Sequence, residues 1–208
     1  MTWHPEILAR QQRRVLAQIG PALSRRGFFL VGGTAVALQL GHRRSVDFDW
    51  FTLERFDPLG VAQELREDGI PFLTKDVATG TLHGLVGSVQ VSLIRHAYPL
   101  LSKLRAWPGG IRIAARADLC AMKLAAVAQR GAKKDFVDIY ALGQRSNSLR
   151  QMLECYRRKF NIEDIAHLLC SLVYFADADP ERLPRMLWTV DWRTIKDTIR
   201  RWLEKVPR

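Results

Sequence analysis

Cysteine, long apolar segments and acidic side chains are all scarce in this sequence of 208 residues. The three cysteines, Cys120, Cys155 and Cys170, lie far apart in apolar stretches that predict helices. This spacing fits neither a disulfide framework nor a CxxC metal site, so we interpret them as reduced core residues. No segment approaches the roughly 20 apolar residues of a membrane span, and the first residues carry charges where a secretory signal needs an apolar run. We therefore expect a soluble, cytoplasmic protein with no membrane partner.

Acidic side chains number 21 against 32 Lys and Arg, which gives a formal net charge of +11. A field of this sign concentrates phosphate-bearing ligands and supplies sequence-independent affinity for nucleic acid. A solubilising basic surface accounts for the same composition. The charge therefore supports a nucleotide or RNA partner without deciding it.

The apolar periodicity predicts a mixed first half. A helix over residues 3–19 is expected to end at the breaker Gly20-Pro21. A short strand at 28–31 is followed by a helix over 34–40, and a third helix is predicted over 58–67. Further strands are predicted at 46–51, 71–77, 81–86, 88–95 and 111–113.

The second half is helical in pattern after the turn signal Trp107-Pro108-Gly109-Gly110. We place a domain boundary there, which gives a domain over residues 1–108 and a mainly helical domain over 109–208. The fold class is therefore α+β, with a mixed sheet flanked by helices and a C-terminal helical bundle. Helices are predicted over 117–130, 134–143, 148–159, 163–177 and 191–205.

Asp47 and Asp49 flank Phe48 in a predicted strand. Alternate residues of a strand point to the same side, so both carboxylates project together while Phe48 turns into the core. Two adjacent anions repel unless a cation lies between them, which makes the pair costly as structure and suitable for Mg²⁺. An Asp-X-Asp pattern is weak evidence alone, since about one arises by chance in a chain of this composition.

A glycine pair strengthens that prediction. Gly32 and Gly33 stand at a strand-to-helix junction, where the backbone can approach a ligand closely and free N–H groups attract phosphate. Thr34 can add its hydroxyl, although a tight turn with Thr34 as N-cap explains the same residues. Arg43 and Arg44 follow in a loop and either grip a triphosphate or an acceptor backbone, or only neutralise nearby Asp.

Three later residues are candidates on helices. Lys123 lies on a basic helix face, and Asp135 and Asp138 share a face near the start of the next predicted helix. Acids at a helix start complement the helix dipole, which is an ordinary structural role.

The segment FLVGGTAVALQLGHRRSVDFD, residues 29–49, closely resembles the opening motif of the AbiEii/AbiGii toxin family of nucleotidyltransferases. A second block, ADLCAMKLAA at 117–126 followed by Arg130 and KDFVDIY at 134–140, is similar to the later helical motifs of that family. The resemblance extends from about residue 25 to 145.

The resemblance implies a polymerase β-like catalytic core and transfer of a nucleoside monophosphate from an NTP to an acceptor hydroxyl. Members characterised as toxins act in phage-defence toxin–antitoxin pairs, some by modifying tRNA. We therefore expect an NTP substrate, an RNA acceptor with tRNA favoured, and a cognate antitoxin.

The resemblance also implies residue roles. The triphosphate would be held at Gly32, Gly33 and Thr34, and Mg²⁺ at Asp47 and Asp49. Lys123, with Asp135 or Asp138, would complete the site, and Arg43 or Arg44 would assist.

Ser92 departs from the superfamily pattern, in which a later strand commonly carries a third carboxylate. Ser cannot replace a carboxylate as general base or as an anionic ligand. Either Asp135 or Asp138 supplies that charge, or metal binding rests on two acids. Two other interpretations follow: a catalytically inactive RNA- or protein-binding module on the same scaffold, and transfer to a protein hydroxyl.

Overall fold

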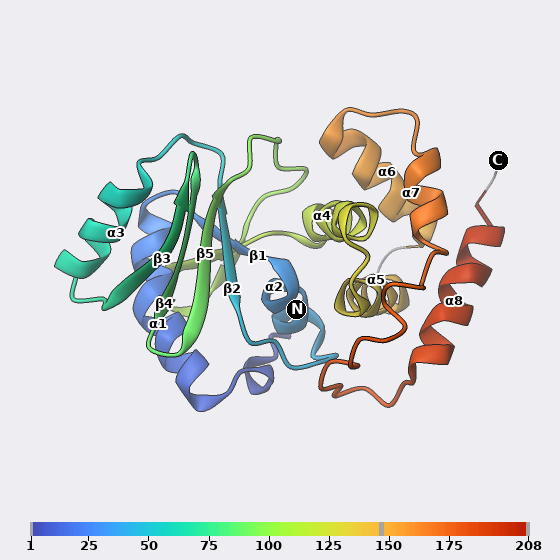
Figure 1. Cartoon of the computed structure of the whole chain (residues 1–208), viewed down its shortest axis with the longest axis horizontal. Helices are drawn as coiled ribbons and strands as arrows, with labels where there is room; N and C mark the ends of the chain where they lie inside the picture. The colour runs from blue at the N-terminus through green and yellow to red at the C-terminus, as the bar shows by residue number, and fades with distance from the viewer. Residues whose placement is uncertain (1, 146–147, 207–208) are drawn as a thin grey trace.

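The computed structural model describes residues 2–145 and 148–206. A seven-stranded sheet with its helices forms one half of the molecule, and helices form the other half from α4 onward (Figure 1). The α+β class with a mixed sheet and a helical C-terminal half, predicted from the sequence, is confirmed.

The sheet has the strand order β3-β4-β5-β2-β1-β7-β6. β2 pairs antiparallel with β1 and parallel with β5, so the sheet is mixed. The strands are β1 (Phe29–Val31), β2 (Phe48–Thr52), β3 (Phe72–Ala78), β4 (Thr81–Val86), β5 (Val89–Arg95), β6 (Arg105–Trp107) and β7 (Ile111–Ile113).

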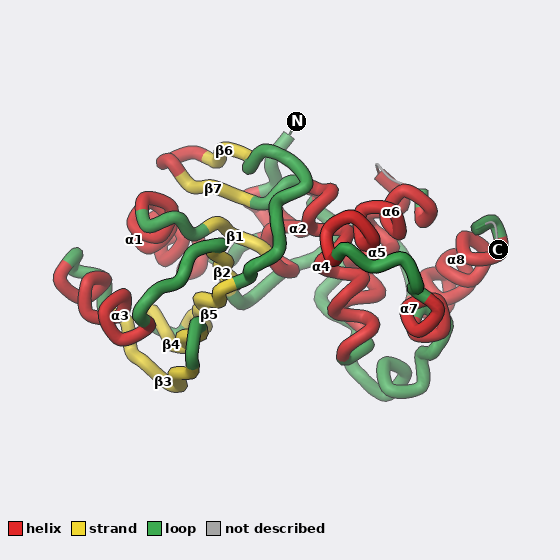
Figure 2. Tube along the Cα trace, turned by 90° about the horizontal axis from the view of Figure 1, so that it is seen from above, coloured by secondary structure: helices red, strands yellow, loops and turns green. Residues whose placement is uncertain are grey.

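Helices lie on both faces of the sheet (Figure 2). α1 and α3 pack on one face, and α2 packs on the other, where it also contacts α4 and α5. The helices are α1 (Arg10–Arg25), α2 (Gly32–Leu40), α3 (Pro58–Glu67), α4 (Arg116–Gln129), α5 (Lys133–Arg145), α6 (Leu149–Phe160), α7 (Ala166–Ser171) and α8 (Trp192–Glu204), with short 3-10 turns η1 (Pro5–Ile7) and η2 (Pro108–Gly110).

Burial along β2 explains which way its polar side chains point. Phe48 and Trp50 are fully buried, and Trp50 packs toward α1 at Gly20. Because strand residues alternate between faces, Asp49 is on the opposite face, which is the face that carries α2. The sheet therefore directs this carboxylate toward the junction between the two halves.

The first helix differs from its prediction. It does not end at Gly20-Pro21 but continues through Pro21 to Arg25, while residues 5–7 form the 3-10 turn η1. The buried positions Ile19, Ala22 and Leu23 continue the helical period past the proline. Burial of this face offsets the roughly 3 kcal/mol that proline costs inside a helix.

Two further predictions are corrected in the helical half. The helix predicted over 163–177 is only α7, because the apolar period fails where Val173 and Tyr174 are exposed. The interpretation of all three cysteines as core residues holds for Cys120 alone, since Cys155 is half-buried and Cys170 is exposed.

The boundary predicted between residues 108 and 109 falls between β6 and β7, which pair with each other. β7 joins the sheet beside β1, and the helical half begins with α4 at Arg116. The division into domains 1–108 and 109–208 stays a prediction. Within residues 2–145 and 148–206, no helix is long and apolar enough to cross a membrane.

Candidate active site

β1 passes directly into α2 at Gly32 and Gly33, and each glycine makes room for a charged side chain. Gly32 has a φ of +68°, which disfavours other residues, and a Cβ there would lie 2.2 Å from Asp49 Oδ2. A Cβ on Gly33 would lie 2.2 Å from Arg43 Nη2. The groups packed against these two positions therefore leave room only for glycine. We call Gly32 and Gly33 the glycine corner.

Asp49 lies against the glycine corner because β2 pairs with β1 in the register Val31 to Asp49. Asp47 precedes β2, which begins at Phe48 and not at residue 46 as predicted. Burial raises the pKa of Asp49, and the charge of Asp47 adds to this rise against the opposing effect of Lys123. The pair is therefore electrostatically unfavourable unless a cation joins it.

The two carboxylates fit a magnesium ion. Neither Asp47 nor Asp49 makes a side-chain hydrogen bond or an ion pair with the residues that the structure describes. In the same part of the chain, no group of three or more His, Cys, Asp and Glu side chains is arranged to hold a metal. Mg²⁺ commonly binds to one or two carboxylates and completes its shell with substrate phosphates and water, so two acids suffice.

Thr34 is turned inward. Its side chain is buried, its hydroxyl donates to the backbone carbonyl of Asp47, and it lies 2.8 Å from Ser45 Oγ. Gln12 Nε2 donates to the Ser45 carbonyl at 2.7 Å. These contacts tie the start of α2 to the loop before β2 and so hold Asp47 beside the glycine corner.

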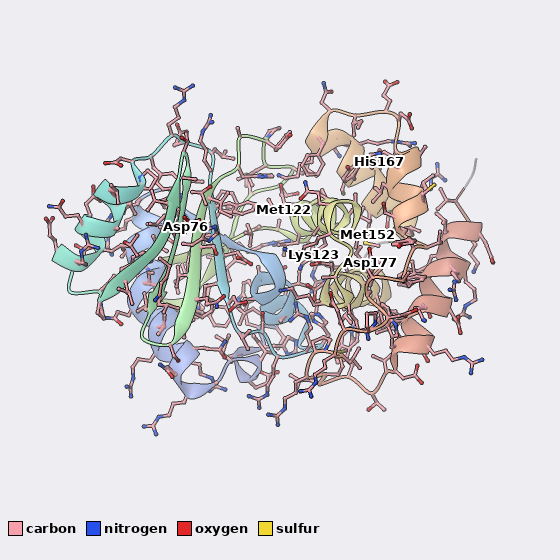
Figure 3. The ribbon with its side chains drawn as sticks, in the orientation of Figure 1. Asp76, Met122, Lys123, Met152, His167 and Asp177 are labelled. Atoms are coloured by element: carbon pink, nitrogen blue, oxygen red, sulfur yellow. The ribbon has the colours of Figure 1, made fainter. Side chains whose placement is uncertain are left out.

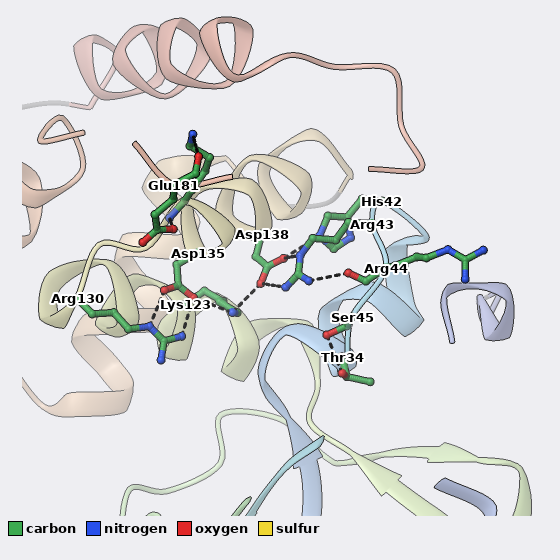
Figure 4. Close-up of polar contacts among 11 residues, drawn as sticks. Thr34, His42, Arg43, Arg44, Ser45, Lys123, Arg130, Asp135, Asp138 and Glu181 are labelled. Atoms are coloured by element: carbon green, nitrogen blue, oxygen red, sulfur yellow. Dashed lines mark hydrogen bonds and ion pairs between the residues drawn. The ribbon is translucent and has the colours of Figure 1, made fainter. Parts of the chain in front are cut away.

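Charged side chains from three segments meet next to this corner (Figure 4). Asp138 on α5 accepts hydrogen bonds from Arg43 Nε at 2.7 Å and Nη2 at 2.9 Å, and lies 2.6 Å from Lys123 Nζ. Asp135 binds Lys123 at 3.0 Å and Arg130 through two contacts of 2.8 and 3.0 Å. We call this set the charge cluster: His42, Arg43, Lys123, Arg130, Asp135 and Asp138.

Electrostatics keep the charge cluster ionised. Burial alone would raise the pKa of Asp138, but Arg43 and Lys123 outweigh it and hold the pKa well below its usual range. Burial would likewise lower the pKa of Lys123, but Asp138 and Asp135 raise it. Three cations thus face two carboxylates, and one positive charge remains beside Asp49.

His42 also belongs to the charge cluster. Its Nε2 lies 2.8 Å from Asp138 Oδ1, across a separation of 96 residues. Burial lowers the pKa of His42 despite this carboxylate. No local signal in the sequence indicates the contact, because α5 brings Asp138 from the other half of the molecule.

Arg44 takes a different position from Arg43. Figure 4 shows its side chain pointing away from Asp138. Its backbone N–H donates to the Arg185 carbonyl at 2.9 Å, and the N–H of Leu187 donates to the His42 carbonyl at 2.8 Å. The segment before α8 therefore holds the loop that carries Arg43.

The sequence candidates thus separate into two groups. Gly32, Gly33, Asp47 and Asp49 form one open corner, and Lys123, Asp135, Asp138 and Arg43 form the buried cluster that adjoins it. The carboxylates of Asp135 and Asp138 are already paired with protein cations. Of the four aspartates, only Asp47 and Asp49 have carboxylate oxygens without a partner among the residues that the structure describes.

Comparison with known proteins identifies the family of this chain. The family model described as nucleotidyl transferase AbiEii toxin, type IV toxin–antitoxin system, matches residues 14–205. An uncharacterized protein of Aquifex aeolicus is 33% identical over 179 residues, which cover 84% of this chain and 86% of the relative.

Solved structures show the same fold. MenT4, a nucleotidyltransferase toxin from Mycobacterium tuberculosis, superposes with a TM-score of 0.63 at 15% identity and covers 93% of this chain and 83% of its own. JHP933 from Helicobacter pylori superposes with a TM-score of 0.55 at 18% identity over 98% of this chain and 94% of its own. The chain is therefore a nucleotidyltransferase and belongs to the AbiEii toxin family of type IV toxin–antitoxin systems.

Proposed function

We propose that this enzyme uses Mg²⁺ to transfer a nucleoside monophosphate from an NTP to a hydroxyl of RNA, with tRNA the favoured acceptor. Membership of the family implies an NTP substrate and an antitoxin counterpart. The proposal rests on one observation. The carboxylates of Asp47 and Asp49, which have no partner among the described residues, lie between the glycine corner and the charge cluster with its one surplus positive charge.

Each part of the site has a role in this reaction. Asp47 and Asp49 would hold Mg²⁺, which supplies Lewis-acid stabilisation of charge on the phosphates. The N–H groups at the start of α2 would receive the β- and γ-phosphates, because Gly32 and Gly33 are half-buried and carry no side chain that covers the backbone. Thr34 would act by positioning the loop before Asp47.

The charge cluster supplies a fixed positive field. Lys123 is held by two carboxylates and Arg43 by a two-point contact, so neither has to reorganise as negative charge develops on the leaving pyrophosphate. In this account Asp135 and Asp138 position the cations and do not bind the metal. Arg44 would contact the acceptor backbone.

The net charge of +11 favours RNA as the acceptor. We further propose that the enzyme acts as the toxin of a phage-defence pair in the cytoplasm, which predicts that its expression arrests growth and that the cognate antitoxin relieves the arrest.

The test uses each α-³²P-labelled NTP with Mg²⁺ and total cellular RNA. We expect label in RNA that RNase removes, and a loss of at least about 100-fold in Asp47→Ala. The control is Asp177→Asn, an exposed carboxylate in the helical half (Figure 3). Label that resists RNase and remains on polypeptide would indicate a protein acceptor, and no label with any NTP would favour a non-catalytic binding module.

A further inference from the structure

A row of polar side chains crosses the α2 face of the sheet beside Asp49. In the parallel pairing of β2 with β5, Asp49 is the partner of Ser92. In the antiparallel pairing of β5 with β4, Ser92 is the partner of His83, and the row continues to Asp76 on β3. Paired residues share a face, so all four side chains are on the side of Asp49.

His83 and Ser92 are in contact within this row. His83 Nδ1 lies 2.9 Å from Ser92 Oγ, and both side chains are partly exposed. Neighbouring strands are about 4.8 Å apart, which places the Cα of His83 about 10 Å from that of Asp49. An imidazole reaching along the row therefore comes close to a phosphate held at Asp49.

The order of the strands gives this row a direction. Asp49 lies between the glycine corner on one side and Ser92 on the other. In phosphoryl and nucleotidyl transfer, the attacking and leaving oxygens are in line on opposite sides of the phosphorus. If pyrophosphate leaves toward the glycine corner, the acceptor hydroxyl approaches from the side of Ser92 and His83.

The carboxylates and cations of the charge cluster are poor acceptors for the proton of that hydroxyl. Asp135 and Asp138 are each paired with two protein cations, and arginine and lysine side chains hold their protons. Ser92 is not a base at neutral pH. His83 has a second ring nitrogen, Nε2, and the hydrogen bonds among the described residues include none to it.

We propose that His83, oriented by Ser92, is the proton acceptor for the attacking hydroxyl; this inference rests on the proposed transfer reaction. With its proton on Nδ1, the imidazole donates to Ser92 Oγ and presents the lone pair of Nε2. The hydroxyl proton moves to Nε2 while the hydroxyl oxygen bonds to the α-phosphorus. The bond from that phosphorus to the pyrophosphate oxygen breaks, pyrophosphate leaves, and the imidazolium returns its proton to water.

The test compares His83→Gln and His83→Ala with Asp49→Asn in the labelled transfer assay. We expect His83→Gln to lower kcat by about 100-fold or more, the usual contribution of a general base. The KM for the NTP and the rise in Tm with Mg²⁺ and NTP should stay within twofold of the wild-type values. Added imidazole should restore turnover to His83→Ala, because the site is partly open to solvent.

The matched control is His167→Gln, an exposed histidine on α7 in the helical half (Figure 3). It should transfer label at the wild-type rate with or without imidazole. Full activity in His83→Gln, with Asp49→Asn inactive, would overturn the role of His83 and leave the reaction intact. A loss of activity that comes with a higher KM for the NTP, and that added imidazole does not restore in His83→Ala, would also overturn it. Loss of a purely structural side chain has these effects. Absence of transfer by the wild-type enzyme would overturn both proposals.

Discussion

Arg43 and Asp138 lie 95 residues apart in the sequence and form a two-point ion pair packed against Gly33. The pair joins the loop before β2 to α5 and thereby connects the sheet to the helical half. Because both side chains are buried, their geometry is fixed before substrate arrives. The position of the positive field beside Asp49 is consequently a property of the fold.

Gly32→Ala should abolish activity. The substitution costs about 1–2 kcal/mol for a left-handed backbone and places a methyl group against the Asp49 carboxylate. Gly69→Ala is the matched control, since Gly69 has a φ of +76° and nothing within 4 Å of its added Cβ. Urea unfolding should show the backbone cost in both variants and an added steric cost in Gly32→Ala, and the transfer assay should show a loss in Gly32→Ala alone. Equal activity in the two variants would contradict the packing of Asp49 on the glycine corner.

Lys123→Met should reduce both stability and turnover. Removing one partner of a buried ion pair costs about 3–5 kcal/mol, and loss of a fixed charge near the phosphates costs about 100-fold in kcat. Lys159→Met is the control, because Lys159 is a buried lysine paired with Asp118 at 2.8 Å outside the charge cluster. Circular dichroism would set an assay temperature at which both variants are folded. Similar losses of kcat in both would show that Lys123 acts through stability only.

Acid should destabilise the folded protein by protonating Asp138. Its folded-state pKa lies well below the ordinary value of 3.8, so the unfolded chain takes up protons first. The stabilisation that ionised Asp138 contributes to the folded state is fully present above pH 3.8, and it is lost as the pH falls through the lowered pKa of Asp138. Denaturant titrations at a series of pH values would measure this slope. Asp138→Asn should be less stable at neutral pH and should show a shallower acid slope; an unchanged slope would contradict the buried pairing.

Asp49→Asn should stabilise the metal-free protein at neutral pH. Burial raises the pKa of Asp49 above 3.8, so the folded state binds the proton more tightly and stability falls as pH rises through the raised pKa. The amide removes that cost. Thermal unfolding in EDTA should give a higher Tm for Asp49→Asn and an unchanged Tm for Asp177→Asn. A lower Tm for Asp49→Asn would show that Asp49 already has a stabilising partner.

The corner that holds Asp49 was predictable because its signals are local. The glycine pair after a short apolar run and the alternation around Phe48 each span only a few residues. Lys123, Asp135 and Asp138 were indicated by the resemblance to the AbiEii/AbiGii family, whereas helix spacing alone left the two acids an ordinary structural role. These patterns depend on strand and helix periods that neighbours in the chain determine.

The contacts between distant segments were not predictable. The bonds of His42 and Arg43 to Asp138, and the register that places Ser92 beside Asp49 and His83 beside Ser92, depend on how the sheet and helices pack. The passage of α1 through Pro21 follows from the same cause, since the buried face of the helix offsets a local penalty. In each case tertiary packing outweighs the local sequence signal.

The most direct test of the central claim is the change in Tm on adding Mg²⁺ together with a nonhydrolysable NTP analogue. A ligand that binds only the folded state raises Tm, by an amount that grows with the logarithm of its concentration above Kd. We predict a rise that requires both components, disappears in Asp49→Asn and persists in Asp177→Asn. No rise in the wild-type enzyme, or an undiminished rise in Asp49→Asn, would show that the two unpaired carboxylates do not hold a magnesium–nucleotide complex.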